Sequence, residues 1–289
     1  MLKIDAPAKI NLALHITGRR ADGYHLIESL VVFAKLGDRV SVQPAERDIF
    51  RVEGPEAAAL SGEDADNNLV VRARDRLRAM ARQSGLELPP VEICLEKRLP
   101  VASGIGGGSA DAAATLKALC ALWDYAPAPE ALSQLALRLG ADVPMCLDGR
   151  ALIARGIGET LSPVNLGFGL DLVIVNPRVS VSTPAVFSAL KERDNAPLPA
   201  PENLDDRDGF VKWLEAARND LQPLAQRMVP DIADCLSALE LVGARLSRMS
   251  GSGASCFGIF DSAEMAQAAA SSLQQNKPGW FVAATGTRR

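Results

Sequence analysis

Four glycines within five residues, Gly104 and Gly106–Gly108, carry the strongest chemical implication in this sequence. They lie in the stretch PVASGIGGGSAD (100–111), between a predicted strand over 91–97 and a predicted helix over 109–122. Glycine lets the backbone approach a ligand with no Cβ in the way, and consecutive N–H groups can then point at one anion. The start of a helix adds a partial positive charge. The spacing therefore predicts a cradle for a polyphosphate.

The glycine cluster does not match the other common phosphate or nucleophile motifs. The string GK is absent, which excludes a P-loop. Ser109 stands where a GxGxxG dinucleotide motif needs its third glycine, and Asp111 stands where a GxSxG elbow needs its last one. HRD and DFG are absent, which argues against a protein kinase. The alternative that remains is a tight strand-to-helix turn in which small residues allow close packing.

Two charged residues are candidates for proton transfer and charge stabilisation. Asp142 follows Gly140, just past a predicted helix end, in a loop where its side chain can face a cleft. The competing interpretation is an aspartate that caps the turn before Pro144. Lys9 lies on the polar side of the first predicted strand, two residues from Asn11. The competing interpretation there is a lysine exposed to solvent.

Alternation of apolar and polar residues predicts that the chain begins with a strand. Even positions from Ile4 to Ile16 are apolar, whereas Lys3, Asp5, Lys9, Asn11 and His15 are polar. Further strands are predicted over 26–34, 38–43, 91–97, 171–175, 244–249, 255–260 and 280–285. Helices are predicted from residue 67 onward and over 109–122, 129–139, 184–191, 210–218, 230–242 and 262–274.

A Gly-rich stretch over 155–170 predicts a boundary between two domains, residues 1–160 and 161–289. In the second, the strands and helices follow a βαββαβ order, which is the ferredoxin-like arrangement. The predicted fold class is therefore α+β, with an N-terminal βα domain and a C-terminal ferredoxin-like domain.

Length, composition and charge exclude several classes of protein. A chain of 289 residues corresponds to about two domains. With 48% hydrophobic and 23% charged residues it is typical of a globular protein, and no apolar run reaches the ~18 residues of a membrane span. The net charge of −4 and the absence of a basic stripe argue against nucleic acid as a partner. The first residues lack the apolar core of a signal peptide, so we expect a cytoplasmic protein.

Cysteine and histidine counts narrow the chemistry further. The five cysteines are odd in number and contain no CxxC pair, so we expect reduced thiols rather than disulfides or a zinc knuckle. His15 and His25 are the only histidines, which excludes a three-histidine zinc site.

Three motifs, in order along the chain, resemble those of the GHMP kinase superfamily. PVASGIGGGSADAAA resembles its second motif, PAKINLALHITGRRADGYH (7–25) its N-terminal motif, and RMSGSGASCFGIF (248–260) its C-terminal glycine loop. The GYH residues and GADVPMCL (140–147) most resemble the members that act on a cytidyl diphosphate substrate. The resemblance implies ATP-dependent phosphorylation of the 2-hydroxyl of a cytidine diphosphate-linked methylerythritol, in the non-mevalonate route to isoprenoid precursors.

The resemblance also implies roles for individual residues. Asp142 would be the catalytic base, and Lys9 its partner, keeping the aspartate ionised and stabilising charge on the transferred phosphoryl group. The substrate-binding residues it implies are Asn11, Tyr24, His25, Thr183 and Phe187. The ATP-binding residues it implies are Asn68, Lys97, Pro100, Val101, Ala102, Ser103, Gly104, Ile105, Gly106, Gly107, Gly108, Ser109 and Ala110. Gly251, Ser252 and Gly253 would form a loop that closes on substrate phosphate.

The chemistry of cytosine fits two of these side chains, because its flat face suits an aromatic sandwich between Tyr24 and Phe187. His25 would pair with the polar edge of the base. The alternatives are core packing for both aromatic rings, a helix N-cap for Thr183, a helix cap for Asn68 and an ordinary hairpin loop for 251–255.

The resemblance implies two further ligands, ATP and the Mg²⁺ that accompanies it. Ser109, at the helix start, is the protein group expected nearest to the metal, and the sequence offers no obvious carboxylate ligand. We expect a small-molecule substrate, no nucleic acid, no membrane, and a monomer or weak homodimer. Two other functions compete with this one. The first is a homoserine or mevalonate type of kinase, and the second is a binding protein without catalysis.

Overall fold

The computed structural model describes residues 1–62, 65–101, 103–200 and 206–288. It contains two compact units, each built from separate stretches of the chain. The first unit comprises Met1–Ala8, Gly37–Val101 and Gly106–Gly149, and the second Lys9–Leu36, Ala102–Ile105 and Arg150–Arg289. Strands β1 (Leu2–Arg19) and β2 (His25–Pro44) pair with each other, and each passes through both units. No single cut in the sequence therefore separates the units.

In the first unit, three neighbouring strands are part of a six-stranded sheet. β3 (Ile49–Glu53) runs parallel to β4 (Val91–Glu96), and β4 runs antiparallel to the second half of β2. Alternate residues of β4 are buried, namely Val91, Ile93 and Leu95, as the sequence predicted. β-Branched and aliphatic residues at this spacing pack well on one face of a pleated strand.

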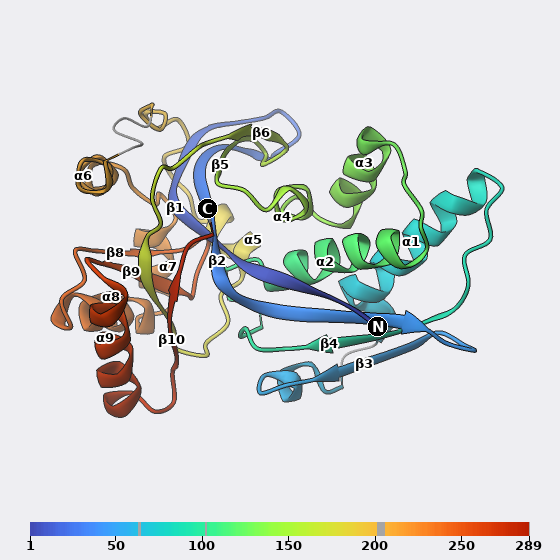
Figure 1. Ribbon diagram of the computed structural model, residues 1–289. Helices are drawn as coiled ribbons and strands as arrows, with labels where there is room; N and C mark the ends of the chain where they lie inside the picture. The colour runs from blue at the N-terminus through green and yellow to red at the C-terminus, as the bar shows by residue number, and fades with distance from the viewer. Residues whose placement is uncertain (63–64, 102, 201–205, 289) are drawn as a thin grey trace. The chain divides into compact units, whose positions relative to one another are not determined.

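The helices of the first unit lie close to one another. α1 (Leu69–Gln83) packs against α2 (Gly107–Leu122), and α4 (Val143–Asp148) packs against α2 and α3 (Pro129–Leu139) (Figure 1). Two short 3₁₀ helices, Ala57–Leu60 and Ala65–Asn67, precede α1. α2 is buried along most of its length because its alanines allow close approach on several sides.

The second unit contains the four-stranded antiparallel sheet that the βαββαβ order predicted. Its strand order is β10–β7–β9–β8. The strands are β7 (Asp171–Asn176), β8 (Leu246–Met249), β9 (Cys256–Phe260) and β10 (Phe281–Gly286). α8 (Asp231–Leu241) and α9 (Ala263–Asn276) pack on this sheet (Figure 1). The other helices of this unit are α5 (Thr183–Ser188), α6 (Arg207–Ala216) and α7 (Gln222–Met228).

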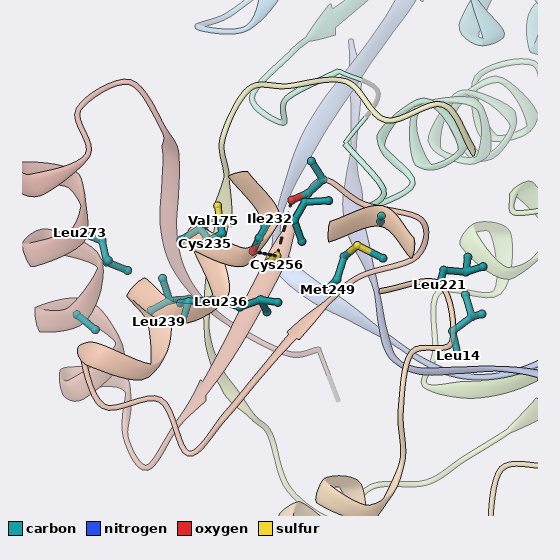
Figure 2. Close-up of a cluster of buried hydrophobic side chains, with 14 of the residues drawn as sticks. Leu14, Val175, Leu221, Ile232, Cys235, Leu236, Leu239, Met249, Cys256 and Leu273 are labelled. Atoms are coloured by element: carbon teal, nitrogen blue, oxygen red, sulfur yellow. Dashed lines mark hydrogen bonds between the residues drawn. The ribbon is translucent and has the colours of Figure 1, made fainter. Parts of the chain in front are cut away.

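A hydrophobic core cluster of the second unit supports the loop that joins β8 to β9. Met249 and Cys256, on either side of that loop, are both fully buried in the cluster shown in Figure 2. The Sγ of Cys256 lies 3.9 Å from the carbonyl oxygen of Ile232 on α8. Burial raises the pKa of the Cys256 thiol well above its usual value, so this thiol stays protonated and inert. All five cysteines are free, as expected.

Two predicted strands, 26–34 and 38–43, are one continuous strand in the structure, so the predicted break between them is wrong. Gly37 lies at that position. A Cβ on Gly37 would come within 2.7 Å of the Cα of Pro7. The glycine allows close approach of β1 rather than a turn.

Short elements account for the other differences from the prediction. The Gly-rich stretch 155–170 contains the end of β5 (Leu152–Gly156) and all of β6 (Thr160–Pro163). These two strands pair antiparallel, and β5 also pairs with the first half of β2. β3, α4 and α7 were not predicted either. Their five to seven residues are too few to establish a periodic pattern.

Among the described residues, no helix has both the length and the apolar character needed to cross a lipid bilayer.

Candidate active site

The glycine-rich segment joins β4 to α2 through two left-handed backbone positions. Gly104 has φ +75° and Gly106, the N-cap of α2, has φ +68°. The first intrahelical bond runs from the N–H of Ala110 to the carbonyl of Gly106, at 2.8 Å. The N–H groups of the first turn have no intrahelical acceptor, and the first turn holds no acidic side chain. This end of α2 has the character of an anion site. Of the predicted ATP-binding residues, Ala102 lies outside the described residues.

Within the second unit, the middle of this segment packs on the loop that joins β8 to β9. The N–H of Ser255 donates to the carbonyl of Ser103 at 3.0 Å, and the hydroxyl of Ser250 donates to the carbonyl of Gly104 at 3.2 Å. A Cβ on Gly104 would lie 2.5 Å from the carbonyl oxygen of Gly253. The loop is a hairpin connection, which was the alternative interpretation of residues 251–255. It also supports the glycine-rich segment.

Lys9 and Asn11 are buried on β1, so the interpretation of Lys9 as a solvated lysine is wrong. The Nζ of Lys9 donates to Oδ1 of Asn11 at 3.0 Å, and the Nδ2 of Asn11 donates to the hydroxyl of Ser29 at 2.7 Å. The backbone N–H of Asn11 donates to the hydroxyl of Ser250 at 3.1 Å, and that of Lys9 donates to the carbonyl of Ile105 at 2.8 Å. The strand that carries Lys9 is thereby bonded to both glycine-containing loops.

Asp142 occupies the N-cap position of α4 and is half-buried. Its side chain makes no capping hydrogen bond to that helix. The alternative interpretation, a carboxylate used to cap the turn before Pro144, is therefore not what the structure has. Asp142 belongs to the first unit and Lys9 to the second, and their pairing stays a prediction.

Lys97 lies in a buried ionic cluster rather than at the surface. Its Nζ lies 2.5 Å from Oδ2 of Asp38 and 3.0 Å from Oδ2 of Asp111. Burial raises the pKa of the Asp111 carboxyl to about 8 against the opposing effect of Lys97. Burial lowers the pKa of Lys97, but the attraction of Asp111 and Asp38 outweighs it and the net pKa is raised. The predicted contact of Lys97 with nucleotide stays a prediction.

Asn68 caps a helix, which was one of its two interpretations. Its side-chain oxygen accepts a hydrogen bond from the N–H of Val70 at 2.9 Å, at the N-cap of α1. A role in binding ATP stays a prediction.

The predicted cytosine-binding side chains gather at the start of β2. The rings of His25 and Phe187 lie 5.3 Å apart, and Tyr24 is 62% exposed, so Tyr24 is not a core residue. The buried Nε2 of His25 has no hydrogen-bond partner among the described residues. Burial, then Arg19 and Arg193, lower the pKa of His25, so its ring is neutral at pH 7. A neutral ring nitrogen without a partner suits hydrogen bonding to a base edge.

Thr183 contacts the loop that joins β8 to β9, residues 250–255, which we call the second glycine loop. Its Oγ1 lies 2.7 Å from the Oγ of Ser252. The N-cap of α5 is Ser182, whose hydroxyl accepts from the N–H of Ala185, so the interpretation of Thr183 as the cap is wrong. Thr183 and Ser252 therefore present two hydroxyls at one place.

Sequence reasoning missed two side chains that fix the second glycine loop. The Nδ2 of Asn219 donates to the carbonyls of Met249 and Gly251, both at 2.8 Å. The guanidinium of Arg248 donates to three main-chain carbonyls, those of Leu12, Leu214 and Ala217. Burial lowers the pKa of Arg248 to about 10. These contacts join residues far apart in sequence, so no local pattern marks them.

The described residues contain no group of three or more His, Cys, Asp or Glu side chains arranged to hold a metal ion. Ser109 is half-buried in the first turn of α2. The hydroxyl of Ser109 is an oxygen ligand of the kind that Mg²⁺ takes.

Two family models match the chain. The model described as "GHMP kinases N terminal domain" matches residues 68–150, and the one described as "GHMP kinases C terminal" matches residues 202–279.

Curated proteins match over nearly the whole chain. A protein of Agrobacterium fabrum (strain C58 / ATCC 33970) is 53% identical over 283 residues, which cover 98% of this chain and 95% of that protein. A protein of Chelativorans sp. (strain BNC1) is 53% identical over 288 residues, with 99% and 96% covered. Both carry the name 4-diphosphocytidyl-2-C-methyl-D-erythritol kinase.

Solved structures match the fold. The crystal structure of a 4-(cytidine 5'-diphospho)-2C-methyl-D-erythritol kinase has a TM-score of 0.84 and 33% identity, with 100% of both chains covered. A homoserine kinase from Cytophaga hutchinsonii has a TM-score of 0.73 at 20% identity, covering 99% of this chain and 94% of its own. The second likeness concerns the fold alone.

Proposed function

The chain belongs to the GHMP kinase family, and we propose that it transfers the γ-phosphoryl group of ATP to the 2-hydroxyl of 4-diphosphocytidyl-2-C-methyl-D-erythritol. The observation that carries this function is the 53% identity, over nearly the whole chain, to enzymes with that name. The reaction belongs to the non-mevalonate synthesis of isoprenoid precursors.

We assign the proton transfer to Asp142. Its carboxylate accepts the proton of the substrate 2-hydroxyl while that oxygen attacks the γ-phosphorus. The bond between the γ-phosphorus and the bridging oxygen breaks, and ADP leaves with the electron pair. The position of Asp142 supports this role, because the residue is half-buried at the start of α4, in the short connection that follows α3.

We assign the charge stabilisation to Lys9. Its ammonium would favour the ionised form of Asp142 and offset negative charge on the transferred group. Support comes from its surroundings, since β1 holds it buried against Asn11 and its backbone is bonded to Ile105 in the glycine-rich segment. A buried ammonium on a bonded strand is preorganised, so little reorganisation is needed during reaction.

The ATP phosphates would lie at the N-terminal end of α2. The first-turn N–H groups of Gly107, Gly108 and Ser109 supply donors, and the helix end supplies partial positive charge. Mg²⁺ bound to the phosphates would neutralise part of their charge, and Ser109 is the residue we place beside it. Lys97 and Asn68 complete the predicted nucleotide site.

The cytidyl group would lie against the start of β2. We place the cytosine ring between Tyr24 and Phe187, with His25 pairing with its edge. The exposure of Tyr24 and the buried Nε2 of His25, which has no partner among the described residues, support this placement, because a stacked base would cover the ring and its edge would bond to the nitrogen. Asn11, Thr183 and the loop Gly251, Ser252 and Gly253 would hold the rest of the substrate.

Expectations about the domain division, the oligomeric state and the cellular location form part of the same proposal. The two family domains would divide along the sequence at residue 160, between the residues 68–150 and 202–279 that the two family models match, although the compact units of the structure each take stretches from both sides of that position. The enzyme would work as a monomer or weak homodimer. Its place would be the cytoplasm, which fits five free thiols.

The experiment that tests the function is a coupled ADP-release assay with ATP, Mg²⁺ and one alcohol at a time. The panel contains the cytidyl substrate, mevalonate, homoserine and galactose. Turnover with the cytidyl compound alone is the expected result. Turnover with another alcohol instead would keep the kinase chemistry and overturn the cytosine assignment. No ADP release with any of the four alcohols, from folded protein that binds ATP, would indicate a binding protein without catalysis.

A further inference from the structure

The buried cluster of Asp38, Lys97 and Asp111 lies entirely in the first unit and joins the two ends of the glycine-rich segment. Lys97 directly follows β4, before the stretch 100–111 begins, and Asp111 is the last residue of that stretch and lies in α2. No residue of the cluster is more than 3% exposed. A buried ion pair of this kind is a weak source of stability, because desolvation offsets its attraction. Stability alone therefore does not explain why these three charged side chains are buried together.

Asp38 is the centre of the cluster. Its Oδ1 accepts hydrogen bonds from the backbone N–H groups of Arg98 and Leu99, at 2.6 and 2.8 Å. Its Oδ2 accepts from the Nζ of Lys97 at 2.5 Å. Three donors therefore converge on one carboxylate. Two of these bonds fix the backbone at the point where the chain leaves β4 for the glycine-rich segment.

Lys97 carries the connection on to α2. Its Nζ also donates to Oδ2 of Asp111, at 3.0 Å. Gly107, the first residue of α2, lies directly over the cluster: a Cβ there would come 3.1 Å from that Nζ and 3.6 Å from Oδ2 of Asp38. The start of the helix is thus held against the ion pair on one side and by the Asp111 side chain one turn later.

The backbone of Lys97 is fixed as well. Its N–H donates to the carbonyl of Glu53 at 2.7 Å, and its carbonyl accepts from the N–H of Glu56 at 3.0 Å. Gly54 allows this approach, because its φ is +98° and a Cβ would lie 2.6 Å from the carbonyl oxygen of Lys97. Neither the side chain nor the backbone of Lys97 is available to move without breaking several bonds.

We propose that Asp38 is a positioning residue for the nucleotide: through Lys97 and two backbone N–H groups, it holds the end of β4 and the first turn of α2 at the spacing that ATP phosphates require. The proposal rests on the proposed function for the location of the phosphates. Lys97 then serves ATP through this cluster, with its ammonium directed to carboxylates. Because phosphate donors are backbone groups, their position depends on whatever fixes the backbone.

The two aspartates provide a matched pair of substitutions. Asparagine at position 38 presents an NH₂ group to one of three converging donors, so at least one of the bonds of Asp38 is lost. Asparagine at position 111 can keep its oxygen toward Lys97, because Oδ1 of Asp111 has no hydrogen-bond partner among the described residues. Both substitutions replace a buried carboxyl group beside Lys97 by an amide. A role that depended only on the presence of that carboxyl group would give both variants the same effect.

The experiment measures the Kd of ADP with Mg²⁺ by calorimetry, and the KM values of ATP and the cytidyl substrate, for Asp38→Asn and Asp111→Asn. Leu135→Ala, in the buried face of α3, is the control for general destabilisation. We expect Asp38→Asn to raise the Kd of ADP and the KM of ATP by about tenfold or more, the effect of losing a hydrogen bond to a charged group. The KM of the cytidyl substrate stays within about twofold, and Asp111→Asn raises the KM of ATP less than about threefold.

Equal effects of the two asparagine variants, an unchanged ADP affinity in Asp38→Asn, or equal rises in both KM values would overturn the proposal. Leu135→Ala should lower the melting temperature and leave nucleotide affinity unchanged. If Asp38→Asn does not fold, Asp38→Glu, which moves the carboxylate by one methylene, takes its place with the same criteria. Wild-type protein that binds ADP but never phosphorylates the cytidyl compound would contradict the proposed function, while the calorimetric comparison would still decide the role of Asp38.

Discussion

Substitution of Gly104 by alanine tests whether contact between the two glycine loops matters for catalysis. The new Cβ would lie 2.5 Å from the carbonyl oxygen of Gly253 and 2.8 Å from that of Ser250. Both neighbours are backbone atoms, so no side chain can rotate away. Restoring even a 3.0 Å contact requires one loop to move by about half an ångström. Alanine at φ +75° also carries a left-handed cost of about 1–2 kcal/mol.

The expected result is a fall in kcat of about tenfold to a hundredfold at saturating substrates, since misplacement by about 1 Å can cost a hundredfold. The control is Gly85→Ala. Gly85 has φ +77°, almost the same as Gly104, but a Cβ there meets nothing within 4 Å. Gly85→Ala should therefore pay the backbone cost in unfolding free energy and keep its kcat.

The assay is steady-state ADP release for both variants, with urea unfolding to measure the free energy of each. Gly104→Ala with wild-type kcat, or with the same activity loss as Gly85→Ala, would refute the argument that packing between these loops positions reacting groups.

Three further predictions follow from the site and its surroundings. Lys9→Ala and Asp142→Ala should each lower kcat by about 10²–10⁴-fold and leave the Kd of ATP within about threefold, measured by ADP release and calorimetry; near wild-type kcat in Asp142→Ala would remove it as the base. Tyr24→Ala should raise the KM of the cytidyl substrate about tenfold without changing the melting temperature, because Tyr24 is 62% exposed and stacking on a base contributes about 1–3 kcal/mol; an unchanged KM would count against the sandwich. His15 should make stability sensitive to acid, because burial lowers its pKa below 6.5 and its Nε2 accepts from the N–H of Arg218 at 3.1 Å. The unfolded chain takes up the proton first, so unfolding free energy is constant above about pH 6.5 and falls as pH drops below it; in His15→Gln, an unchanged slope between pH 6.5 and 5.5 would contradict this.

The sequence predicted most of the elements because their periodicity is local. The helix that begins near Asn68 and the strand 91–97 have periodic apolar residues, and this spacing can be interpreted without knowledge of distant contacts. The continuous β2 was missed for the opposite reason. Glycine is common in turns, so Gly37 was interpreted as a turn residue. The structure explains the glycine by the close approach of Pro7 on β1. A glycine pattern gives the same signal for both causes.

The site shows the same division between local and distant information. The motifs drew attention to Gly104 and Lys97, but not to what surrounds them. Ser250 bonds Gly104, and Asp38 bonds Lys97, across 146 and 59 residues. Exposure to solvent was one interpretation of Lys9, yet Lys9 is buried on β1. Hydrogen bonds from distant loops satisfy such groups, and a single sequence does not reveal those partners.

The most direct measurement of the central claim is the product formed from ATP, Mg²⁺ and 4-diphosphocytidyl-2-C-methyl-D-erythritol by the wild-type protein, followed by ³¹P NMR. The account predicts one new phosphomonoester, on the 2-hydroxyl, in equal amount to ADP. ADP accompanied only by inorganic phosphate, a phosphate on another hydroxyl, or no ADP from folded protein that binds ATP would contradict it.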